Sequence, residues 1–242
     1  DTDLDLVATA ISSVVSLTNN GAEGFADAVT LPGDAAIPRG IAAGDFDNDG
    51  DMDLVTAHSG NATVQVHLNA GDGTYAAPVA LAGTLARAWD VEIGDVNSDG
   101  NLDVVAVGRE RAPAAAWYGN GEGGFGAHDE IGSLYRPTDD VAVALGDLDD
   151  DGDLDVVMAR AAVHALMYYE NLGDGWSTPR DVVSAAIQCL TLIPMDVDGD
   201  NDLDLVGNAV TEDKSFWFEN DGHGAFGQMK ILGSPSTVPT WM

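Results

Sequence analysis

The chain has 242 residues, enough for one or two domains of ordinary size, and 45% of them are apolar, so a substantial core can form. It carries 41 acidic and 9 basic residues, which gives a formal net charge of -32 at pH 7. This charge argues against nucleic acid as a partner and against docking onto an anionic membrane, because both need clustered lysine and arginine. The single cysteine, Cys189, excludes an intrachain disulfide, and no apolar run is long enough to insert into a membrane.

Acidic residues recur along the chain in one pattern. Aspartate, or asparagine in its place, occupies every second position of a nine-residue segment that occurs at residues 45–53, 95–103, 147–155 and 196–204. The first five residues, with Asp1, Asp3 and Asp5, match the end of a fifth copy. The last aspartates of the copies stand at positions 5, 53, 103, 155 and 204, so they are 48, 50, 52 and 49 residues apart.

A second motif, an asparagine followed by glycines and an aromatic residue, recurs in step with the first. Its copies end at Phe25, Tyr75, Phe125, Trp176 and Phe226, with intervals of 50, 50, 51 and 50 residues. Two independent patterns with one period indicate five repeats of about fifty residues. We expect the five aromatic side chains to pack between neighbouring repeats.

Each repeat is expected to contain four short strands, taken in chain order. The first precedes the acidic loop, as at residues 41–43 and 141–145, and the second follows it, as at 54–57 and 102–107. The third leads into the asparagine-glycine turn, as at 64–68 and 217–218, and the fourth leaves the aromatic residue, as at 79–81 and 229–232. Four-stranded units of this length are typical of propeller blades. We therefore predict an all-β fold, a single β-propeller domain over residues 1–242 with five four-stranded blades.

The two ends of the chain suggest how the propeller closes. Residues 236–242 resemble the strand that precedes each acidic loop, and Met242 aligns with Met195. The favoured arrangement is a closed five-bladed ring in which the C-terminal strand pairs with the N-terminal strand, because only a few loop residues are missing between them. The alternative is a piece of a longer array.

The alternating carboxylates favour calcium. This hard cation takes six to eight oxygen ligands at flexible geometry, whereas magnesium prefers to keep several waters. Gly50, Gly100 and Gly152 permit the sharp turn of the loop, and Asn201, which takes that position in the fourth loop, tolerates left-handed backbone. Paired carboxylates also hydrolyse glycosides, but near-identical loops in every repeat favour a structural role, since an active site is normally unique.

The segment GDFDNDGDMDLV, followed by an N-x-G-x-G-x-aromatic turn, resembles the FG-GAP/VCBS repeat family, which includes the propeller of integrin alpha subunits. The resemblance covers nearly the whole chain, although family propellers usually have seven blades. It implies that loop positions one, three, five and nine provide side-chain ligands for calcium and position seven a backbone carbonyl.

This resemblance assigns the expected metal ligands residue by residue. In the complete loops they are Asp45, Asp47, Asp49, Asp51 and Asp53; Asp95, Asn97, Asp99, Asn101 and Asp103; Asp147, Asp149, Asp151, Asp153 and Asp155; and Asp196, Asp198, Asp200, Asp202 and Asp204. The second loop has the fewest charges and should bind most weakly. We expect one Ca2+ for each of these four loops, with a fifth ion at the partial loop through Asp1 and Asp5.

In the resembled family the acidic loops lie on one face, and the connections between blades and between second and third strands lie on the other. By that scheme seven of the nine basic residues share the face opposite calcium: Arg39, Arg87, Arg136, Arg109, Arg111, Arg160 and Lys214. We hypothesise that this face binds an acidic glycan or a carboxylate-bearing protein ligand through Arg39, Arg87 and Arg136, with Trp89 and Tyr135 stacking on sugar rings. The alternative is that these arginines pair with nearby acids such as Asp90, Glu110 and Asp139.

The favoured function is a calcium-stabilised binding or adhesion module, extracellular or at the cell surface, because extracellular calcium can fill loops of modest affinity. One alternative is a polysaccharide lyase that uses Arg136 or Arg87 to neutralise a carboxylate and Tyr135 or His58 as base. Another is an architectural module of a larger surface protein. No catalytic residue is assigned, and neither the ligand's identity nor the oligomeric state is predicted.

Overall fold

A computed structural model describes residues 4–33, 36–83, 85–109, 114–132, 140–160, 165–183, 189–209 and 214–232. Contacts group the chain into two compact units, Asp1–Glu130 and Ile131–Met242, and each unit is described by itself. Within the described ranges the only helix is the three-residue 3-10 turn η1 (Gly21–Glu23), so none there has the length and apolar character needed to span a membrane.

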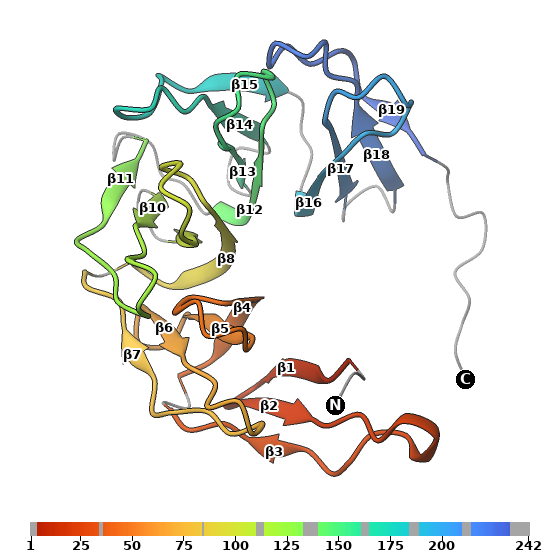
Figure 1. Ribbon diagram of the computed structural model, residues 1–242. Helices are drawn as coiled ribbons and strands as arrows, with labels where there is room; N and C mark the ends of the chain where they lie inside the picture. Colours follow the sequence, from red (N-terminus) through yellow and green to blue (C-terminus); the bar gives the residue numbers. More distant parts are fainter. Residues whose placement is uncertain are drawn as a thin grey trace. The chain divides into compact units, whose positions relative to one another are not determined.

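The first unit contains three antiparallel sheets, and each is a meander in which consecutive strands pair (Figure 1). The first sheet has β1 (Leu6–Ala10), β2 (Ser13–Leu17) and β3 (Val29–Thr30). The second has β4 (Pro38–Gly44), β5 (Asp53–His58), β6 (Thr63–His67) and β7 (Val79–Ala80). The third has β8 (Ala88–Gly94), β9 (Asp103–Gly108), β10 (Ala114–Trp117) and β11 (Asp129–Ile131).

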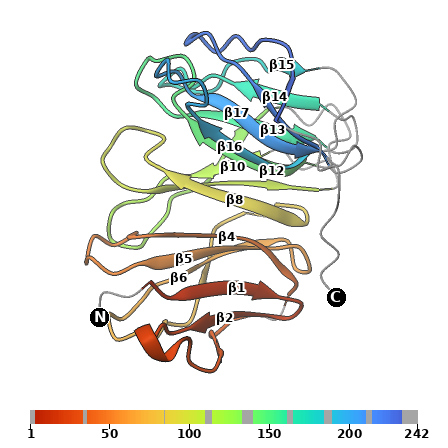
Figure 2. The same cartoon turned by 90° about the vertical axis from the view of Figure 1, so that its right-hand side faces the viewer.

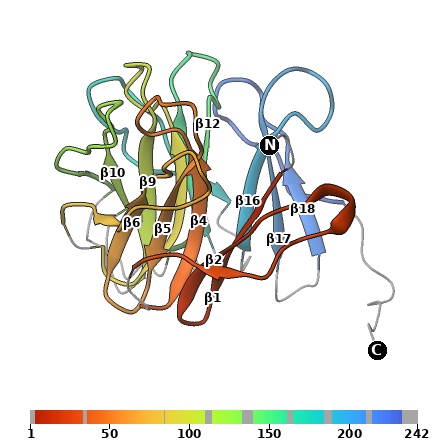
Figure 3. The ribbon, with the colours of Figure 1, turned by 60° about the horizontal axis from the view of Figure 1, so that its bottom comes forward.

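The second unit contains two sheets of the same kind. The fourth sheet has β12 (Asp140–Gly146), β13 (Asp155–Arg160), β14 (Ala165–Tyr169) and β15 (Arg180–Val183). The fifth has β16 (Cys189–Met195), β17 (Asp204–Ala209), β18 (Lys214–Phe218) and β19 (Lys230–Ile231). Figure 3 shows β16, β17 and β18 running side by side.

The predicted all-β fold is confirmed, with one propeller-like antiparallel sheet in each repeat and the strands where the sequence pattern placed them. Four sheets have the predicted four strands, whereas the first has three within the described residues. Residues 236–242, which were expected to complete that sheet as the strand preceding its acidic loop, lie outside the described part of the chain. Closure of a ring and organisation as a single domain therefore stay predictions.

The core of the first unit lies between successive sheets. All six residues of β5 and all six of β9 are buried, and within the unit β5 lies in the sheet between the first and the third. Val55, Val66, Val104 and Trp117 belong to one buried apolar cluster that joins the second sheet to the third. Figure 2 shows β1, β4 and β8 in successive layers, and β4 contacts both of the others.

A β-bulge lies near the start of the first strand in the second and third sheets. The register shifts between Pro38 and Ile41 in β4 and between Ala88 and Asp90 in β8. A Cβ added at Gly40 would lie 2.8 Å from the Cα of Asp90, so glycine lets the two bulged segments approach closely. Bulges re-aim side chains, and here they bring the start of β4 beside the start of β8.

Candidate functional sites

Each acidic loop turns through two residues in the left-handed region. The predicted turn position has φ values of 92° at Gly50, 89° at Gly100, 97° at Gly152 and 78° at Asn201. The expectation for the glycines, and for Asn201 as their substitute, is therefore confirmed. Two positions earlier a second left-handed residue, which the sequence did not suggest, occurs at Asn48, Ser98, Asp150 and Gly199.

Backbone hydrogen bonds organise the first half of each loop. Asp45 accepts from the N–H of Asp49 at 3.2 Å and from that of Gly50 at 3.0 Å, and Asp49 accepts from the N–H of Asp51 at 2.9 Å. The same bonds recur at Asp95 with Asp99 and Gly100, and at Asp147 with Asp151 and Gly152. In the fourth loop Asp196 accepts from Gly199 and Asn201. These hydrogen bonds hold the loop backbone wrapped around the carboxylates.

The ninth loop position is fully buried and joins the loop to the asparagine-glycine turn of its own repeat. One carboxylate oxygen of Asp53 accepts from the N–H of Phe46 at 2.9 Å, and the other accepts from the N–H of Asn69 at 2.7 Å. Equivalent pairs of bonds are made by Asp103 with Val96 and Gly119, by Asp155 with Leu148 and Asn171, and by Asp204 with Val197 and Asn220. We call this arrangement the aspartate clamp.

The structure gathers the predicted metal ligands in three of the four complete loops. Carboxylate oxygens lie within 4.8 Å of one another in the groups Asp45, Asp47 and Asp53; Asp147, Asp149 and Asp151; and Asp196, Asp198 and Asp204. In the second loop, where Asn97 and Asn101 replace acids, the described residues form no such group of three. Weaker binding by the second loop therefore stays a prediction.

Two of these carboxylates are suited to a cation. The Oδ1 atoms of Asp47 and Asp149 are buried and have no hydrogen-bond partner among the described residues. Burial, followed by repulsion from Asp49 in one case and Asp151 in the other, raises the pKa of each carboxyl above its usual value. A hard dication would satisfy both oxygens and relieve the repulsion, so the residues present fit calcium.

The partial loop at the start of the chain keeps the half of the clamp that reaches the turn. Asp5 accepts from the N–H of Asn19 at 2.7 Å, and the side chain of Asn19 donates to the carbonyl of Leu4 at 3.0 Å. Asp1 lies outside the described residues. Metal binding by Asp1 and Asp5 therefore stays a prediction.

The turn aromatics pack mostly as predicted. Phe125 meets Phe46 of the preceding sheet edge-to-face, with ring centroids 5.6 Å apart, and Phe226 meets Tyr168 in the same manner at 6.1 Å. Tyr75 packs against the core of the first sheet. Phe25 is the exception, with 48% of its surface exposed, because within the described residues no sheet precedes its own.

Three residues of the predicted ligand face form a stack in the first unit. The guanidinium of Arg39 lies 4.7 Å from the ring centroid of Trp89, and that of Arg109 lies 4.1 Å from it. Arg39 and Trp89 occupy the two bulges, at the strand ends remote from the acidic loops. We call this arrangement the arginine-tryptophan stack.

The guanidinium groups of the stack have no carboxylate partner among the described residues. The Nε atom of Arg109 is buried and likewise has no hydrogen-bond partner there. By contrast, Arg180, which lies outside the predicted face, pairs with Glu170 at 2.9 Å and lies over Tyr168. The stack therefore has donor capacity that no described carboxylate occupies.

The remaining predicted ligand residues divide into two groups. Arg87 is beside the stack, where its carbonyl accepts from the N–H of Arg109 at 3.2 Å and its own φ is 47°. Tyr135 and Arg136 lie outside the described residues. His58, considered as a base for the lyase alternative, is buried and lies 2.8 Å from the hydroxyl of Thr56.

These features define a repeat protein in which each complete repeat carries one antiparallel sheet, one acidic loop and one clamp. The FG-GAP-like repeat family matches residues 1–56, 49–106, 95–158 and 147–207. The chain therefore belongs to the FG-GAP-like repeat family, which confirms the resemblance seen in the sequence. No curated protein matches the chain.

Solved structures with the same fold share little sequence with the chain. A lectin from Agrocybe aegerita, described as recognising non-reducing terminal N-acetylglucosamine, is 21% identical with a TM-score of 0.65, over 95% of this chain and 62% of the lectin. An inactive variant of virginiamycin B lyase from Staphylococcus aureus with quinupristin is 12% identical with a TM-score of 0.62, over 95% of this chain and 66% of the lyase. The chain thus spans less than two thirds of either protein, and the likeness concerns the fold.

Proposed function

We propose that the chain is an extracellular binding module that calcium stabilises and that recognises an anionic ligand, with acidic glycans as the leading class. The arginine-tryptophan stack carries the proposal. Stacking on Trp89 holds the planes of Arg39 and Arg109 while their N–H edges stay available for carboxylate or sulfate oxygens. Less side-chain entropy is then lost when an anion binds.

The charge of the chain sharpens this argument. With a formal net charge of -32, the molecule repels anions at long range. Two arginines without carboxylate partners among the described residues therefore form a local site that opposes the general field. The lectin fold-neighbour supports a carbohydrate as the ligand class, since its recognition of N-acetylglucosamine takes place on the same fold.

Calcium completes the proposal. The three groups of converging carboxylates would hold one ion each, and the ion would supply charge that neutralises the loops. Such loops with modest affinity fill in extracellular fluid and not in resting cytosol, which supports an extracellular location.

Binding of sulfated and uronate oligosaccharides, measured by titration calorimetry in buffered calcium, tests the anion site. We expect the double variant Arg39→Gln/Arg109→Gln to lose about tenfold or more in affinity. Arg180→Gln is the matched control, because that arginine also lies over an aromatic ring but pairs with Glu170. Equal affinities for the double variant and the wild type would exclude the stack as the site.

Acidic glycans can also bind through calcium itself, and a loop variant separates the two cases. Asp47→Asn weakens the first metal group and leaves the stack intact. Glycan binding that falls with Asp47→Asn but not with the double arginine variant would assign the ligand to the metal loops and refute the proposal.

A further inference from the structure

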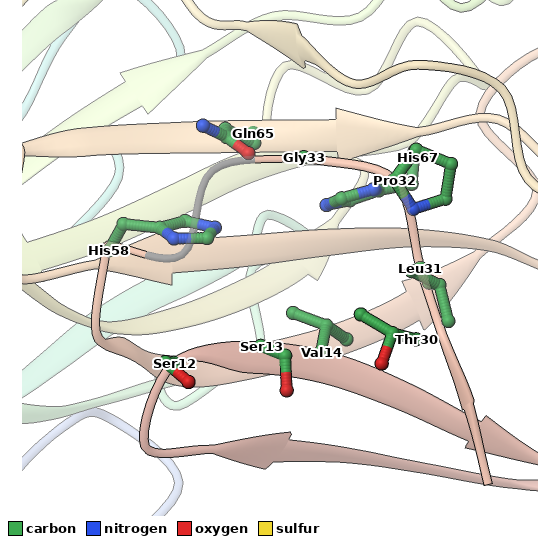
Figure 4. Close-up of a pocket in the computed structure, with 10 residues that line it drawn as sticks. All are labelled: Ser12, Ser13, Val14, Thr30, Leu31, Pro32, Gly33, His58, Gln65 and His67. Atoms are coloured by element: carbon green, nitrogen blue, oxygen red, sulfur yellow. The ribbon is translucent and has the colours of Figure 1, made fainter.

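A pocket of about 110 Å³ lies between the first and second sheets of the first unit (Figure 4). Its lining runs from the exposed residues Ser12, Pro32 and Gly33 to the buried side chains of Gln65 and His67. Gln65 is 4% exposed and His67 is 1% exposed. The pocket therefore connects the surface with a polar interior.

A hydroxyl joins two histidines at the buried end. Oγ1 of Thr56 lies 2.8 Å from Nε2 of His58 and 3.1 Å from Nε2 of His67. The Oε1 atom of Gln65 and the Nδ1 atom of His67 are buried and have no hydrogen-bond partner among the described residues. Buried polar atoms of this kind normally bind something, because leaving them unsatisfied costs about 1–3 kcal/mol each.

This polar cluster is peculiar to the second sheet. The strand register aligns Thr56, His58, Gln65 and His67 with Ala106, Gly108, Ala115 and Trp117 of the third sheet. It aligns the same four with Met158, Arg160, Met167 and Tyr169 of the fourth sheet, and with Gly207, Ala209, Phe216 and Phe218 of the fifth. An aromatic ring fills the place of His67 in each of those three sheets, so the pocket is a local departure from the repeat.

The His67 end of the pocket is uncharged near neutral pH. Burial, followed by the influence of His58, lowers the pKa of His67 to about 4, so its imidazole is neutral at pH 7. The lining contains no acidic, lysine or arginine side chain. A charged ligand would therefore lose its hydration without meeting an opposite charge.

The hydrogen-bond donors and acceptors of the pocket narrow the chemical class of the ligand further. The hydroxyl of Thr56 has one proton, so it can donate to only one imidazole, and the other imidazole donates its Nε2–H to Oγ1 and keeps an accepting Nδ1. In the pocket, Oε1 of Gln65 is an acceptor, and Nδ1 of His67 is an acceptor in one tautomer and a donor in the other. A carboxylate or sulfate has only acceptors and would leave Oε1 of Gln65 without a partner, whereas a hydroxyl group can donate to Gln65 and either donate to or accept from His67.

We propose that this pocket is a second binding site, which takes the hydroxyl-bearing end of a small uncharged ligand, a polyol or one edge of a neutral sugar. The volume has room for roughly three to four water-sized groups, which suits a few vicinal hydroxyls and not a whole oligosaccharide. The inference does not depend on the arginine-tryptophan stack, which recognises charge.

Saturation-transfer NMR of the full chain with glycerol, D-glucose, D-galactose and D-mannose tests the proposal. We expect transfer from at least one probe, and a loss of about tenfold or more in its affinity in His67→Phe and in Gln65→Met. These substitutions introduce side chains found at the same positions of the fifth and fourth sheets, Phe218 and Met167. His128→Phe is the matched control, because His128 packs on Trp117 away from the pocket.

The NMR signals of the His67 imidazole provide a second readout. Binding should shift the side-chain nitrogen resonances of His67 and leave those of His128 unchanged. If no neutral probe shifts His67, or if acetate and sulfate alone do so, the pocket holds water or anions and the proposal is overturned. The double variant Arg39→Gln/Arg109→Gln should bind the neutral probes normally, so failure of the stack and failure of the pocket are distinguishable.

Discussion

The buried carboxylate of Asp53 and the backbone N–H of Asn69 are joined by a 2.7 Å hydrogen bond across 16 residues of sequence. The side chain of Asn69 returns a bond to the carbonyl of Met52 at 3.1 Å. The acidic loop and the asparagine-glycine turn are therefore parts of one hydrogen-bonded unit. This explains why two motifs that look independent in the sequence share one period.

Replacing Asp53 should destabilise the protein without involving metal. Asp53→Ala leaves the N–H groups of Phe46 and Asn69 without their acceptor in a buried place, and we expect a loss of about 2–5 kcal/mol in the free energy of unfolding. Urea unfolding in excess chelator measures this effect. The control is Asp27→Asn, because Asp27 is exposed. A loss seen only when calcium is present would assign Asp53 to metal binding alone.

Asp47 should have opposite effects in the presence and absence of calcium. Its pKa is raised by burial and neighbouring carboxylates, so the ionised form is disfavoured in the metal-free fold, and Asp47→Asn should raise the melting temperature in chelator. In excess calcium the same variant should lose a ligand and show a smaller rise on metal addition.

Thermal unfolding of the variants with calcium and with chelator tests this pair of effects. Asp51→Asn is a matched control in the same loop, since the family resemblance assigns Asp51 only a backbone carbonyl ligand. An undiminished calcium response in Asp47→Asn would contradict the predicted ligand set. No calcium response in the wild type would remove the structural metal role from the proposed function.

His67 should make the protein less stable in mild acid. The unfolded chain binds a proton at the ordinary pKa of 6.5, whereas folded His67 does so only near 4, so stability falls as the pH drops through this interval. Between pH 7.5 and pH 5 we expect a loss of roughly 2 kcal/mol from this residue. Urea unfolding of wild type and His67→Phe at both pH values isolates it, because the carboxylates contribute equally to both proteins.

His128→Phe provides the comparison for that experiment. His128 packs on Trp117 away from the pocket, so the variant should keep the acid sensitivity of the wild type. Identical acid sensitivity in His67→Phe and the wild type would show that His67 is accessible to protons in the folded state.

Gly40 should tolerate no side chain. In Gly40→Ala the new Cβ would lie 2.8 Å from the Cα of Asp90 and 2.9 Å from the N of Val91, both backbone atoms, and we expect a cost of about 1–3 kcal/mol in unfolding free energy. Gly126→Ala should cost far less, because nothing lies within 4 Å of its Cβ. Separation of β4 from β8 should also weaken anion binding at the stack; normal binding and stability in Gly40→Ala would contradict the close approach.

Much of the fold could be predicted because the same sequence pattern occurs five times in the chain. Short apolar runs of fixed spacing placed the strands, and the left-handed turn at Gly50 followed from the need for glycine there. The clamp could not be predicted in the same way. A carboxylate in an acidic loop looks like a metal ligand, and only its burial shows that Asp53 also satisfies two backbone N–H groups.

The stack and the pocket form through contacts between neighbouring repeats, and the spacing of motifs along the sequence does not specify such contacts. The sequence grouped Arg39 and Trp89 on one face, but their stacking with Arg109 depends on two bulges and the glycine between them. The pocket at His67 was not predicted, because it lies where one repeat differs from the others. It becomes visible only when the strand register identifies which residues of the other sheets occupy the same place.

The side chain at the position of His67 differs from sheet to sheet, while the strand register around it stays the same. Trp117, Tyr169 and Phe218 are buried at that position in their sheets, while the smaller polar ring of His67 borders a pocket in the second. Since the aspartate clamp joins the loop and the turn within one repeat, such exchanges leave the clamp unchanged. A pocket could thus be transplanted to another sheet, or erased from its present one, by changing only a few inward-facing side chains.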